Sequence, residues 1–244
     1  MMLFLVGIGP GGGPDMTERA RAALAASDLI VGYTVYIDLL RADFSDKELR
    51  ATPMRCEVER ARMALAEAAA GRTVALVCSG DPGVYGMAGL CFELAPEFPP
   101  VDIEVVAGVT AATAAAAALG APLMHDFAVI SLSDLLTPWE LIEARLDAAA
   151  RADFVICLYN PSSRSRADHL QRACDVLLRS KSPATACGYA RNVGRAGEEV
   201  RTLTLGELRG APADMFMTVL VGNSSTRFIG GRMVTPRGYG LEGS

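Results

Sequence analysis

The sequence predicts an α/β fold of two lobes, and three observations support this prediction. Short apolar runs alternate with segments of helical spacing along the 244 residues. The runs are almost continuously apolar, which is typical of parallel strands covered by helices on both faces. Hydrophobic residues make up 51% of the chain, so a sizeable core can form.

The first half of the chain contains four predicted strands and four predicted helices. The strands are expected at residues 3–7, 29–32, 73–78 and 103–106. The helices are expected at residues 17–26, 58–70, 85–94 and 110–119. Thr17 can accept a hydrogen bond from the first turn, so we expect it to cap the first helix.

A second run of elements begins after Gly120 and Pro122, which interrupt the pattern. Strands are expected at residues 126–131, 154–159, 184–188, 200–204 and 217–221, and helices at 138–150 and 166–178. We therefore predict a boundary at residues 119–124. It separates an α/β lobe of residues 1–120 with glycine-rich loops from a second α/β lobe of residues 121–244 with a mixed sheet.

Charge and cysteine content narrow the classes of function. The net charge of −5 gives no general reason to expect a nucleic acid partner. Residues 1–120 carry 15 acidic and 9 basic side chains, against 13 and 14 in the rest, so the second lobe suits an anionic ligand better. The six cysteines form no C-x-x-C pair, and only two histidines are present. These features predict buried thiols in a cytoplasmic protein with no metal site.

Neither apolar stretch of the chain resembles a membrane or targeting segment. The run at residues 2–6 is short, and glycines end it at once. The alanine-rich stretch at residues 105–123 is interrupted by Gly108, Gly120 and Pro122. A buried helix is therefore expected there, with no membrane partner.

The first glycine-rich loop, residues 7–13, fits the pattern G-x-G-x-x-G. This pattern can place a dinucleotide on a helix N-terminus, which would indicate a nicotinamide-dependent reductase. Against that hypothesis, Pro10 lacks an N–H, Pro14 delays the helix, and no acidic residue follows the second strand to hold a ribose. A turn with no ligand is about equally compatible with the motif.

The second loop, Ser79-Gly80-Asp81-Pro82-Gly83, follows an apolar run and is the strongest candidate for a small-molecule site. Asp81 can cap the following helix or face a cationic or hydroxylated ligand, and both alternatives stay open. The third loop, residues 107–112, is rich in small residues. Close packing is its default interpretation, although such residues also let a ligand approach the backbone.

The fourth loop, residues 158–166, combines Tyr159 and Asn160 with hydroxyl groups, Arg164 and Arg166. Arginine binds carboxylates through its planar fork, but a capped helix start with solvated arginines would give the same pattern. His125 and Asp126 lie at the predicted domain junction. They can form a structural pair or perform acid–base chemistry.

Several segments together resemble a known family. Residues 6–12, 79–82 and 108–111 are similar to the tetrapyrrole methylases, which use S-adenosylmethionine and do not have a Rossmann fold. Residues 31–36, 83–90, 134–139, 158–161 and 231–239 extend the resemblance over nearly the whole chain. They are most similar to the precorrin-3B C-17-methyltransferase family. Gly12 and Gly13 depart from the superfamily pattern, which commonly has an acidic residue after the first Gly-Pro-Gly.

The resemblance implies a tetrapyrrole methylase fold with its active site in the cleft between two lobes, a homodimer, and a small-molecule tetrapyrrole substrate. The implied cofactor-binding residues are Pro10, Ser79, Gly80, Asp81, Val84, Thr110, Ala111, Leu158, Tyr159, Gly188 and Met217. The candidate catalytic residues are His125, Asp126 and Tyr159. The candidate substrate-binding residues are Asn160, Arg164, Arg166 and Arg191, because the substrate carries many carboxylates.

The resemblance also implies an activity. It is the transfer of a methyl group from S-adenosylmethionine to C-17 of precorrin-3B, with ring contraction to precorrin-4, in cobalamin biosynthesis. The lack of a cysteine cluster favours the stand-alone aerobic form of the enzyme. One alternative is that the substrate is cobalt-factor III. Another is that the methyl group is transferred to a different carbon of a precorrin. More distant alternatives are a nicotinamide-dependent reductase and a non-catalytic tetrapyrrole carrier.

Overall fold

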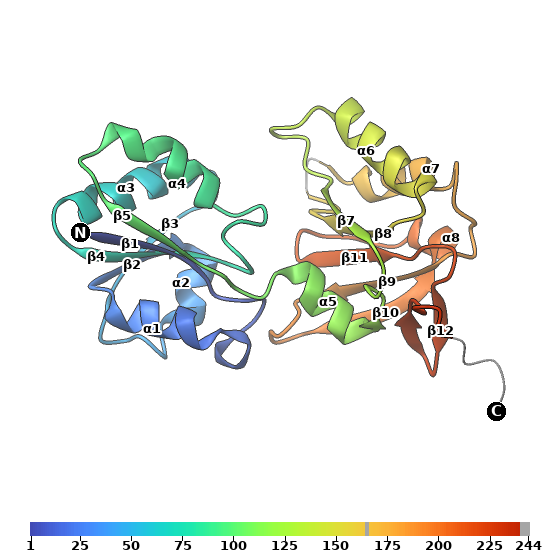
Figure 1. Ribbon diagram of the computed structural model, residues 1–244, viewed down its shortest axis with the longest axis horizontal. Helices are drawn as coiled ribbons and strands as arrows, with labels where there is room; N and C mark the ends of the chain where they lie inside the picture. Colours follow the sequence, from blue (N-terminus) through green and yellow to red (C-terminus); the bar gives the residue numbers. More distant parts are fainter. Residues whose placement is uncertain (164–165, 240–244) are drawn as a thin grey trace. The chain divides into compact units, whose positions relative to one another are not determined.

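The computed structural model describes residues 1–163 and 166–239. It confirms the α/β class and divides the chain into two compact units, Met1–Ala111 and Ala112–Ser244. Each unit contains its own central sheet (Figure 1).

The first unit has a five-stranded, fully parallel sheet in the order β3-β2-β4-β1-β5. Its strands are β1 (Met2–Gly7), β2 (Leu29–Tyr33), β3 (Glu48–Thr52), β4 (Thr73–Cys78) and β5 (Asp102–Val106).

Its helices are α1 (Glu18–Ala26), α2 (Thr34–Leu40), α3 (Glu57–Ala69) and α4 (Ala88–Leu94), with short 3-10 turns η1 (Gly13–Asp15) and η2 (Ala95–Glu97). Helices α1 and α2 cover one face of the sheet, and α3 and α4 cover the other (Figure 1).

The local signals of the first unit agree with these elements. Strands β1 and β4 run side by side from Met2↔Thr73 to Gly7↔Cys78, and helices bury both of their faces. Thr17 caps α1 as predicted, because its hydroxyl oxygen accepts the Ala20 N–H at 3.1 Å. The sequence did not predict α2 or β3. Strand β3 is an edge strand of polar sequence, which carries no apolar run to reveal it.

Four charged residues link the edge strand β3 to α3. Arg50 and Arg72 each bind both Glu48 and Glu67, and the pair Arg72–Glu48 is 2.6 Å apart. Hydrogen bonds from Arg72 and Arg50 hold the pKa of Glu48 below its usual value, and the same arginines lower the pKa of Glu67. The cluster therefore joins the edge strand to the helix through ionised carboxylates.

The pH dependence of folding should report this cluster. A carboxylate whose pKa is lower in the folded state adds stability above its unfolded pKa, and this stability is lost as the pH falls through the folded value. We expect the free energy of unfolding, measured with urea, to decrease as the pH falls below about 4.3. The double variant Glu48→Gln/Glu67→Gln should show a shallower decrease. An identical pH profile for variant and wild type would contradict a role for these carboxylates.

The second unit has a mixed five-stranded sheet in the order β10-β9-β11-β8-β7, in which only β7 and β8 are parallel. Its strands are β7 (Phe127–Ser131), β8 (Val155–Tyr159), β9 (Ala186–Arg191), β10 (Glu199–Thr204) and β11 (Met217–Val221). Helices α6 (Trp139–Arg151), α7 (His169–Leu177) and α8 (Leu205–Leu208) pack against one face of this sheet. Helix α5 (Ala111–Leu119) packs against the other (Figure 1).

Helix α5 explains why the units divide at Ala111–Ala112 and not at the predicted 120–121. The buried face of α5 packs against Cys157, Ala190 and Leu220 of the second sheet. Alanine side chains allow this close approach of helix to sheet. The helix therefore belongs to the second core, although in sequence it continues the glycine-bearing segment that follows β5.

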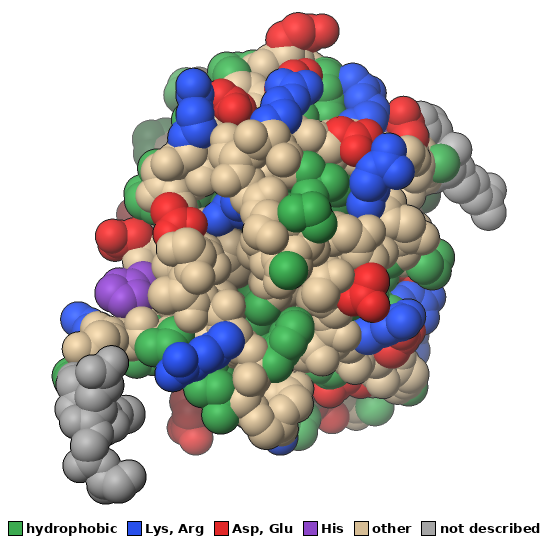
Figure 2. Space-filling view, turned by 90° about the vertical axis from the view of Figure 1, so that its right-hand side faces the viewer, with side chains coloured by type: hydrophobic (Ala, Val, Ile, Leu, Met, Phe, Trp, Pro, Cys, Tyr) green, Lys and Arg blue, Asp and Glu red, His purple; other side chains and the backbone are tan. Residues whose placement is uncertain are grey.

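A small third sheet completes the second unit. It contains β12 (Arg227–Ile229), β13 (Arg232–Val234) and β6 (Gly120–Ala121), and the β12–β13 hairpin was not predicted from the sequence. On the face of the second unit drawn in Figure 2, basic and acidic side chains are interspersed with apolar ones. Within residues 1–163 and 166–239, none of the helices has the length and apolar character required to span a membrane.

Candidate functional site

Three loops meet at the carboxyl edge of the first sheet, where β1, β4 and β5 end side by side. The Gly9 N–H donates to the Gly80 carbonyl at 3.2 Å, and the Gly80 N–H donates back to the Gly9 carbonyl at 2.8 Å. The loops after β1 and β4 then lead to helices on opposite faces of the sheet. Open α/β sheets bind ligands at such an edge.

Glycine is required at this meeting point because backbone atoms fill the space of a side chain. A Cβ atom on Gly108 would lie 2.1 Å from the Gly80 carbonyl oxygen. A Cβ atom on Gly7 would lie 2.5 Å from the same oxygen. Gly9 and Gly80 also have positive φ angles of 73° and 68°, which glycine adopts without strain. The three loops therefore form a tight backbone junction.

This junction weakens the dinucleotide hypothesis for residues 7–13. Strand β1 ends at Gly7, but helix α1 begins only at Glu18. In the dinucleotide motif the glycines open the helix, so that its first N–H groups hold the pyrophosphate. Here Gly7 packs against the backbone of Gly80 and Gly108, and Gly9 forms hydrogen bonds with Gly80.

Asp81 links the second and third loops. One carboxylate oxygen accepts the Gly83 N–H at 2.8 Å, and the other accepts the Gly108 N–H at 3.0 Å. Helix α4 begins at Ala88, and its N-cap is Met87. Asp81 is therefore not the cap of α4 but a bridge that fixes the positions of two loops relative to each other.

The implied cofactor-binding residues of the first unit gather at this junction. Gly80 lies beside Thr110 and Ala111, since a Cβ atom on Gly80 would be 3.6 Å from Thr110 Cα. Pro10 is buried and adjoins Gly9, while Val84 closes the second loop by donating its N–H to the Asp81 carbonyl. Residues from three separate loops thus lie close together at this end of the sheet.

In the second unit, several predicted residues share one edge of the sheet. Tyr159 ends β8 and Asn160 follows it. Met217 begins the antiparallel β11, and Arg191 ends β9 opposite Met217. The Tyr159 hydroxyl accepts the Ala112 N–H at 2.7 Å and so binds the first turn of α5. Asn160 has a positive φ of 53° and donates its amide to Ser131 Oγ at 2.9 Å.

Three other implied cofactor residues of this unit serve packing. Leu158 is fully buried, and Met217 is 4% exposed within the same core. A Cβ atom on Gly188 would lie 2.4 Å from Leu119 Cδ2, so the Leu119 side chain of α5 packs directly against the sheet at this glycine. A role of these residues in cofactor binding stays a prediction.

The three candidate catalytic residues do not lie together. His125 and Asp126 are exposed and precede β7, whereas Tyr159 ends the parallel strand β8. Phe127 pairs with Val155 at one end, and Ser131 pairs with Tyr159 at the other. At about 3.3 Å per residue the two ends are roughly 13 Å apart. His125 and Asp126 therefore cannot act with Tyr159 on one reacting atom.

The candidate substrate arginines already have partners. The Arg166 side chain is 14% exposed, donates to Ser133 and Ser163, and lies 3.8 Å from Asp134. Arg191 binds Asp214 at 2.6 Å, which raises the pKa of its guanidinium. Arg164 lies outside the described residues. Arg166 and Arg191 thus belong to polar networks and are not simply solvated.

The cysteines are all free, and all but Cys56 are buried. Burial raises the pKa of Cys78 to about 11 and that of Cys157 to about 12. The expectation of buried thiols is confirmed for five of the six cysteines, and Cys56 is half-buried. These thiols remain protonated at neutral pH, so they are not activated nucleophiles.

Comparison with known proteins shows which family combines these features. The family described as "Tetrapyrrole (Corrin/Porphyrin) Methylases" matches residues 2–209. The chain belongs to the tetrapyrrole methylases. The methylase is 51% identical over 241 residues to the "Probable cobalt-factor III C(17)-methyltransferase" of Salmonella typhimurium, and the match covers 98% of this chain and 100% of that protein.

Two further comparisons extend this result. The methylase is 46% identical over 242 residues to the "Cobalt-factor III methyltransferase" of Priestia megaterium, and the match covers 97% of this chain but 45% of that longer protein. Among solved structures, "the methyltransferase CobJ" superposes with a TM-score of 0.88 at 41% identity, covering 96% of this chain and 99% of that one. The names of the Salmonella typhimurium and Priestia megaterium proteins both specify cobalt-factor III and not precorrin-3B.

Sequence reasoning missed a polar cluster beside Arg166 in this methylase. The buried His169 donates from Nδ1 to the Leu132 carbonyl at 2.8 Å, and its Nε2 lies 3.6 Å from Asp134. The ring centroids of Trp139 and His169 are 4.9 Å apart. The Arg172 guanidinium carbon lies 3.9 Å from the Trp139 ring centroid, in a cation–π contact. These residues come from separate segments, so spacing gave no signal. In the described part of the chain, no group of three or more His, Cys, Asp or Glu residues is arranged to hold a metal ion.

Proposed function

We propose that this tetrapyrrole methylase transfers a methyl group from S-adenosylmethionine to C-17 of cobalt-factor III in cobalamin biosynthesis. One observation carries the proposal. The Salmonella typhimurium relative matches along its whole length, and its name gives both this substrate and this carbon. The Priestia megaterium relative has the same substrate in its name.

The sequence alone favours precorrin-3B, partly because it shows no cysteine cluster. That criterion does not separate the two substrates. The Salmonella typhimurium relative is covered completely by a match of 241 residues, yet it is named for cobalt-factor III. We therefore place cobalt-factor III first and keep precorrin-3B as the second candidate.

The loop junction of the first unit fits S-adenosylmethionine. This cofactor has an amino acid end, ribose hydroxyls and an adenine, which suit backbone N–H and C=O groups and small hydroxyl side chains. The neighbouring segments at Ser79, Gly80, Thr110 and Ala111 contain such groups. When bound, the cofactor supplies a methyl group that is already a strong electrophile.

The residues of the chain need to orient the reactants more than to activate a nucleophile. Rigid alignment of donor and acceptor and exclusion of water can supply much of the acceleration. The two backbone hydrogen bonds between Gly9 and Gly80, together with the Asp81 bridge, give the loops that rigidity. We further propose that Tyr159 is the acid–base candidate to retain for the ring contraction, since it shares a sheet edge with Arg191 and Asn160.

The substrate assignment can be tested by product analysis. The protein is incubated with ¹³C-methyl S-adenosylmethionine and either cobalt-factor III or precorrin-3B, and the products are analysed by mass spectrometry and NMR. We expect one labelled methyl group at C-17 of cobalt-factor III. Methylation of precorrin-3B alone would overturn the choice of substrate.

Two further measurements address the remaining expectations. Calorimetry should show binding of S-adenosylhomocysteine and none of NADPH, and the opposite result would support the reductase alternative. The homodimer and the cytoplasmic location stay predictions. Light scattering of the purified protein tests the first of these.

A further inference from the structure

Arg60 is a buried charge in the first unit that the loop junction does not use. The residue is 3% exposed, although it lies on helix α3 close to its start. Its Nε donates to Thr52 Oγ1 at 2.6 Å, one terminal nitrogen donates to the Pro53 carbonyl at 2.9 Å, and the other lies 3.3 Å from Met87 Sδ. All three partners are neutral.

Among the described residues, no carboxylate forms an ion pair with Arg60. A buried charge is unfavourable unless it is paired. A guanidinium has five N–H groups, and the contacts of Arg60 use three of them. The two remaining N–H groups are suited to an anionic acceptor.

A cavity of about 160 Å³ lies beside this guanidinium. Arg60, Tyr33 and Met87 line it together with Ser79, the first residue of the second loop. The Tyr33 ring lies 5.9 Å from the Arg60 guanidinium carbon, at the range of a cation–π contact. The cavity has the volume of roughly five water molecules, so it can hold a carboxyalkyl group but no macrocycle.

The mouth of the cavity contains a residue in an unusual conformation. Tyr85 also lines the cavity, is 56% exposed and has a positive φ of 53°. Such backbone conformations in bulky residues are uncommon and concentrate at functional sites. The cavity therefore adjoins the second loop at Ser79 and the segment that follows this loop at Tyr85.

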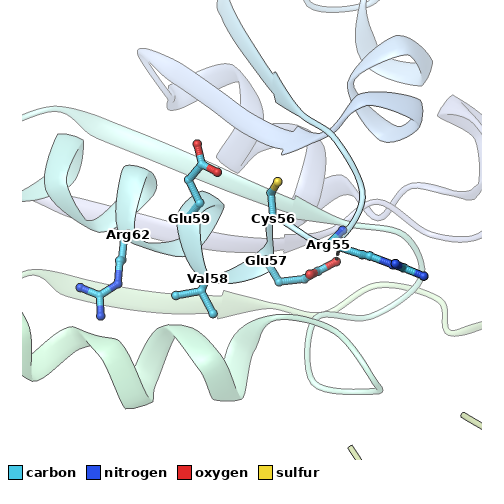
Figure 3. Close-up of a pocket in the computed structure, with 6 residues that line it drawn as sticks. All are labelled: Arg55, Cys56, Glu57, Val58, Glu59 and Arg62. Carbon is cyan, nitrogen blue, oxygen red and sulfur yellow. Dashed lines mark hydrogen bonds between the residues drawn. The ribbon is translucent and has the colours of Figure 1, made fainter. Parts of the chain in front are cut away.

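Among the described residues that line the cavity, one side chain is acidic, and it makes no ion pair with Arg60. Glu57 is exposed, and its carboxylate accepts the Arg55 N–H at 3.2 Å (Figure 3). A second, more open hollow of about 490 Å³ shares Glu57 with this cavity and is lined by residues from Arg55 to Arg62 (Figure 3). Its charges are mixed, and Arg62 is bound to Glu97. Among the described residues that line the smaller cavity, Arg60 is the one cation and Glu57 the one carboxylate, and no ion pair joins them.

We propose that the cavity beside Arg60 is a carboxylate-binding subsite of this methylase. The proposal rests on the proposed function, because both the tetrapyrrole and S-adenosylmethionine carry carboxylates. A carboxylate in the cavity neutralises the buried guanidinium and accepts its two remaining N–H groups in charge-assisted hydrogen bonds. The two ligands share this chemistry, and binding measurements distinguish between them.

The experiment compares wild type with Arg60→Gln, and with Arg62→Gln as a matched control on the same helix. Equilibrium dissociation constants are measured for S-adenosylhomocysteine by calorimetry and for cobalt-factor III by absorbance, without turnover. We expect Arg60→Gln to weaken one of the two ligands by about tenfold or more and to leave the other unchanged. The weakened ligand is the one that supplies the carboxylate. Arg62→Gln should change neither constant.

Other outcomes overturn the proposal. Unchanged constants in folded Arg60→Gln, or equal weakening of both ligands together with a lower unfolding midpoint, would show a structural role only. If Arg60→Gln does not fold, Arg60→Lys keeps the charge but removes the planar fork, and an unchanged constant for both ligands would have the same meaning. A wild type that binds both ligands but transfers no methyl group contradicts the proposed function and leaves the comparison of arginine variants valid.

Discussion

Gly108→Ala is expected to abolish binding of S-adenosylhomocysteine and to destabilise the first unit by about 3 kcal/mol. The added Cβ atom would lie 2.1 Å from the Gly80 carbonyl oxygen and 2.7 Å from the Gly7 carbonyl oxygen. Both obstacles are backbone atoms, so no side-chain rotation can relieve the overlap. The ends of β1, β4 and β5 would have to separate, and the surface formed by the three loops would be lost.

The matched control for this variant is Gly89→Ala. Gly89 lies in helix α4 of the same unit, and a Cβ atom there would meet no atom within 4 Å. This control should retain ligand binding and gain up to about 1 kcal/mol of stability, because alanine favours a helix over glycine. Calorimetry and urea unfolding of both variants give the comparison. Normal binding of the cofactor product by Gly108→Ala would show that the loop junction is not part of the cofactor site.

The strands of the first sheet could be predicted because the physics that forms them is visible in single segments. Parallel strands covered on both faces must be apolar throughout, and β1 and β4 meet this condition. Strand β3 is half solvent-exposed at the sheet edge, so its segment Glu48–Thr52 shows no such run. Edge position is a property of the assembled sheet and cannot be read from the strand itself.

The glycine loops of the site were predictable for a similar reason. Backbone junctions and positive φ angles require glycine, as at Gly9 and Gly80. Arg60 could not be predicted, because Arg60 and Arg62 lie two residues apart in the same helical segment. One is buried against Thr52, and the other binds Glu97 at the surface. The two arginines differ in burial because they lie on different faces of α3. Which face of α3 packs against the sheet is determined only by the fold.

The structure separates the catalytic candidates for a topological reason. His125 and Asp126 lie near the predicted domain junction in sequence, which suggests a position close to the site. The parallel pairing of β7 with β8 instead places them at the opposite end of the strands from Tyr159. Strand direction depends on the sheet topology, and no local pattern in residues 121–131 reports it.

Asp81→Asn is the second variant for which we expect a large effect, because both oxygens of Asp81 accept backbone N–H groups. An asparagine amide has one acceptor oxygen and one NH₂ group. Either Gly83 or Gly108 would therefore face a donor instead of an acceptor. The expected cost is about 1–3 kcal/mol in unfolding free energy, with at least about tenfold weaker binding of S-adenosylhomocysteine.

Asp46→Asn provides the control for this charge change, since Asp46 is an exposed residue of the same unit. It should alter neither the free energy of unfolding nor cofactor binding.

The two measurements on Asp81→Asn also separate the roles considered for this carboxylate. A loss of both stability and affinity indicates that Asp81 acts by bridging the loops. A loss of affinity with unchanged stability would instead indicate that the negative charge acts directly on the ligand, and the bridge would then be dispensable for folding.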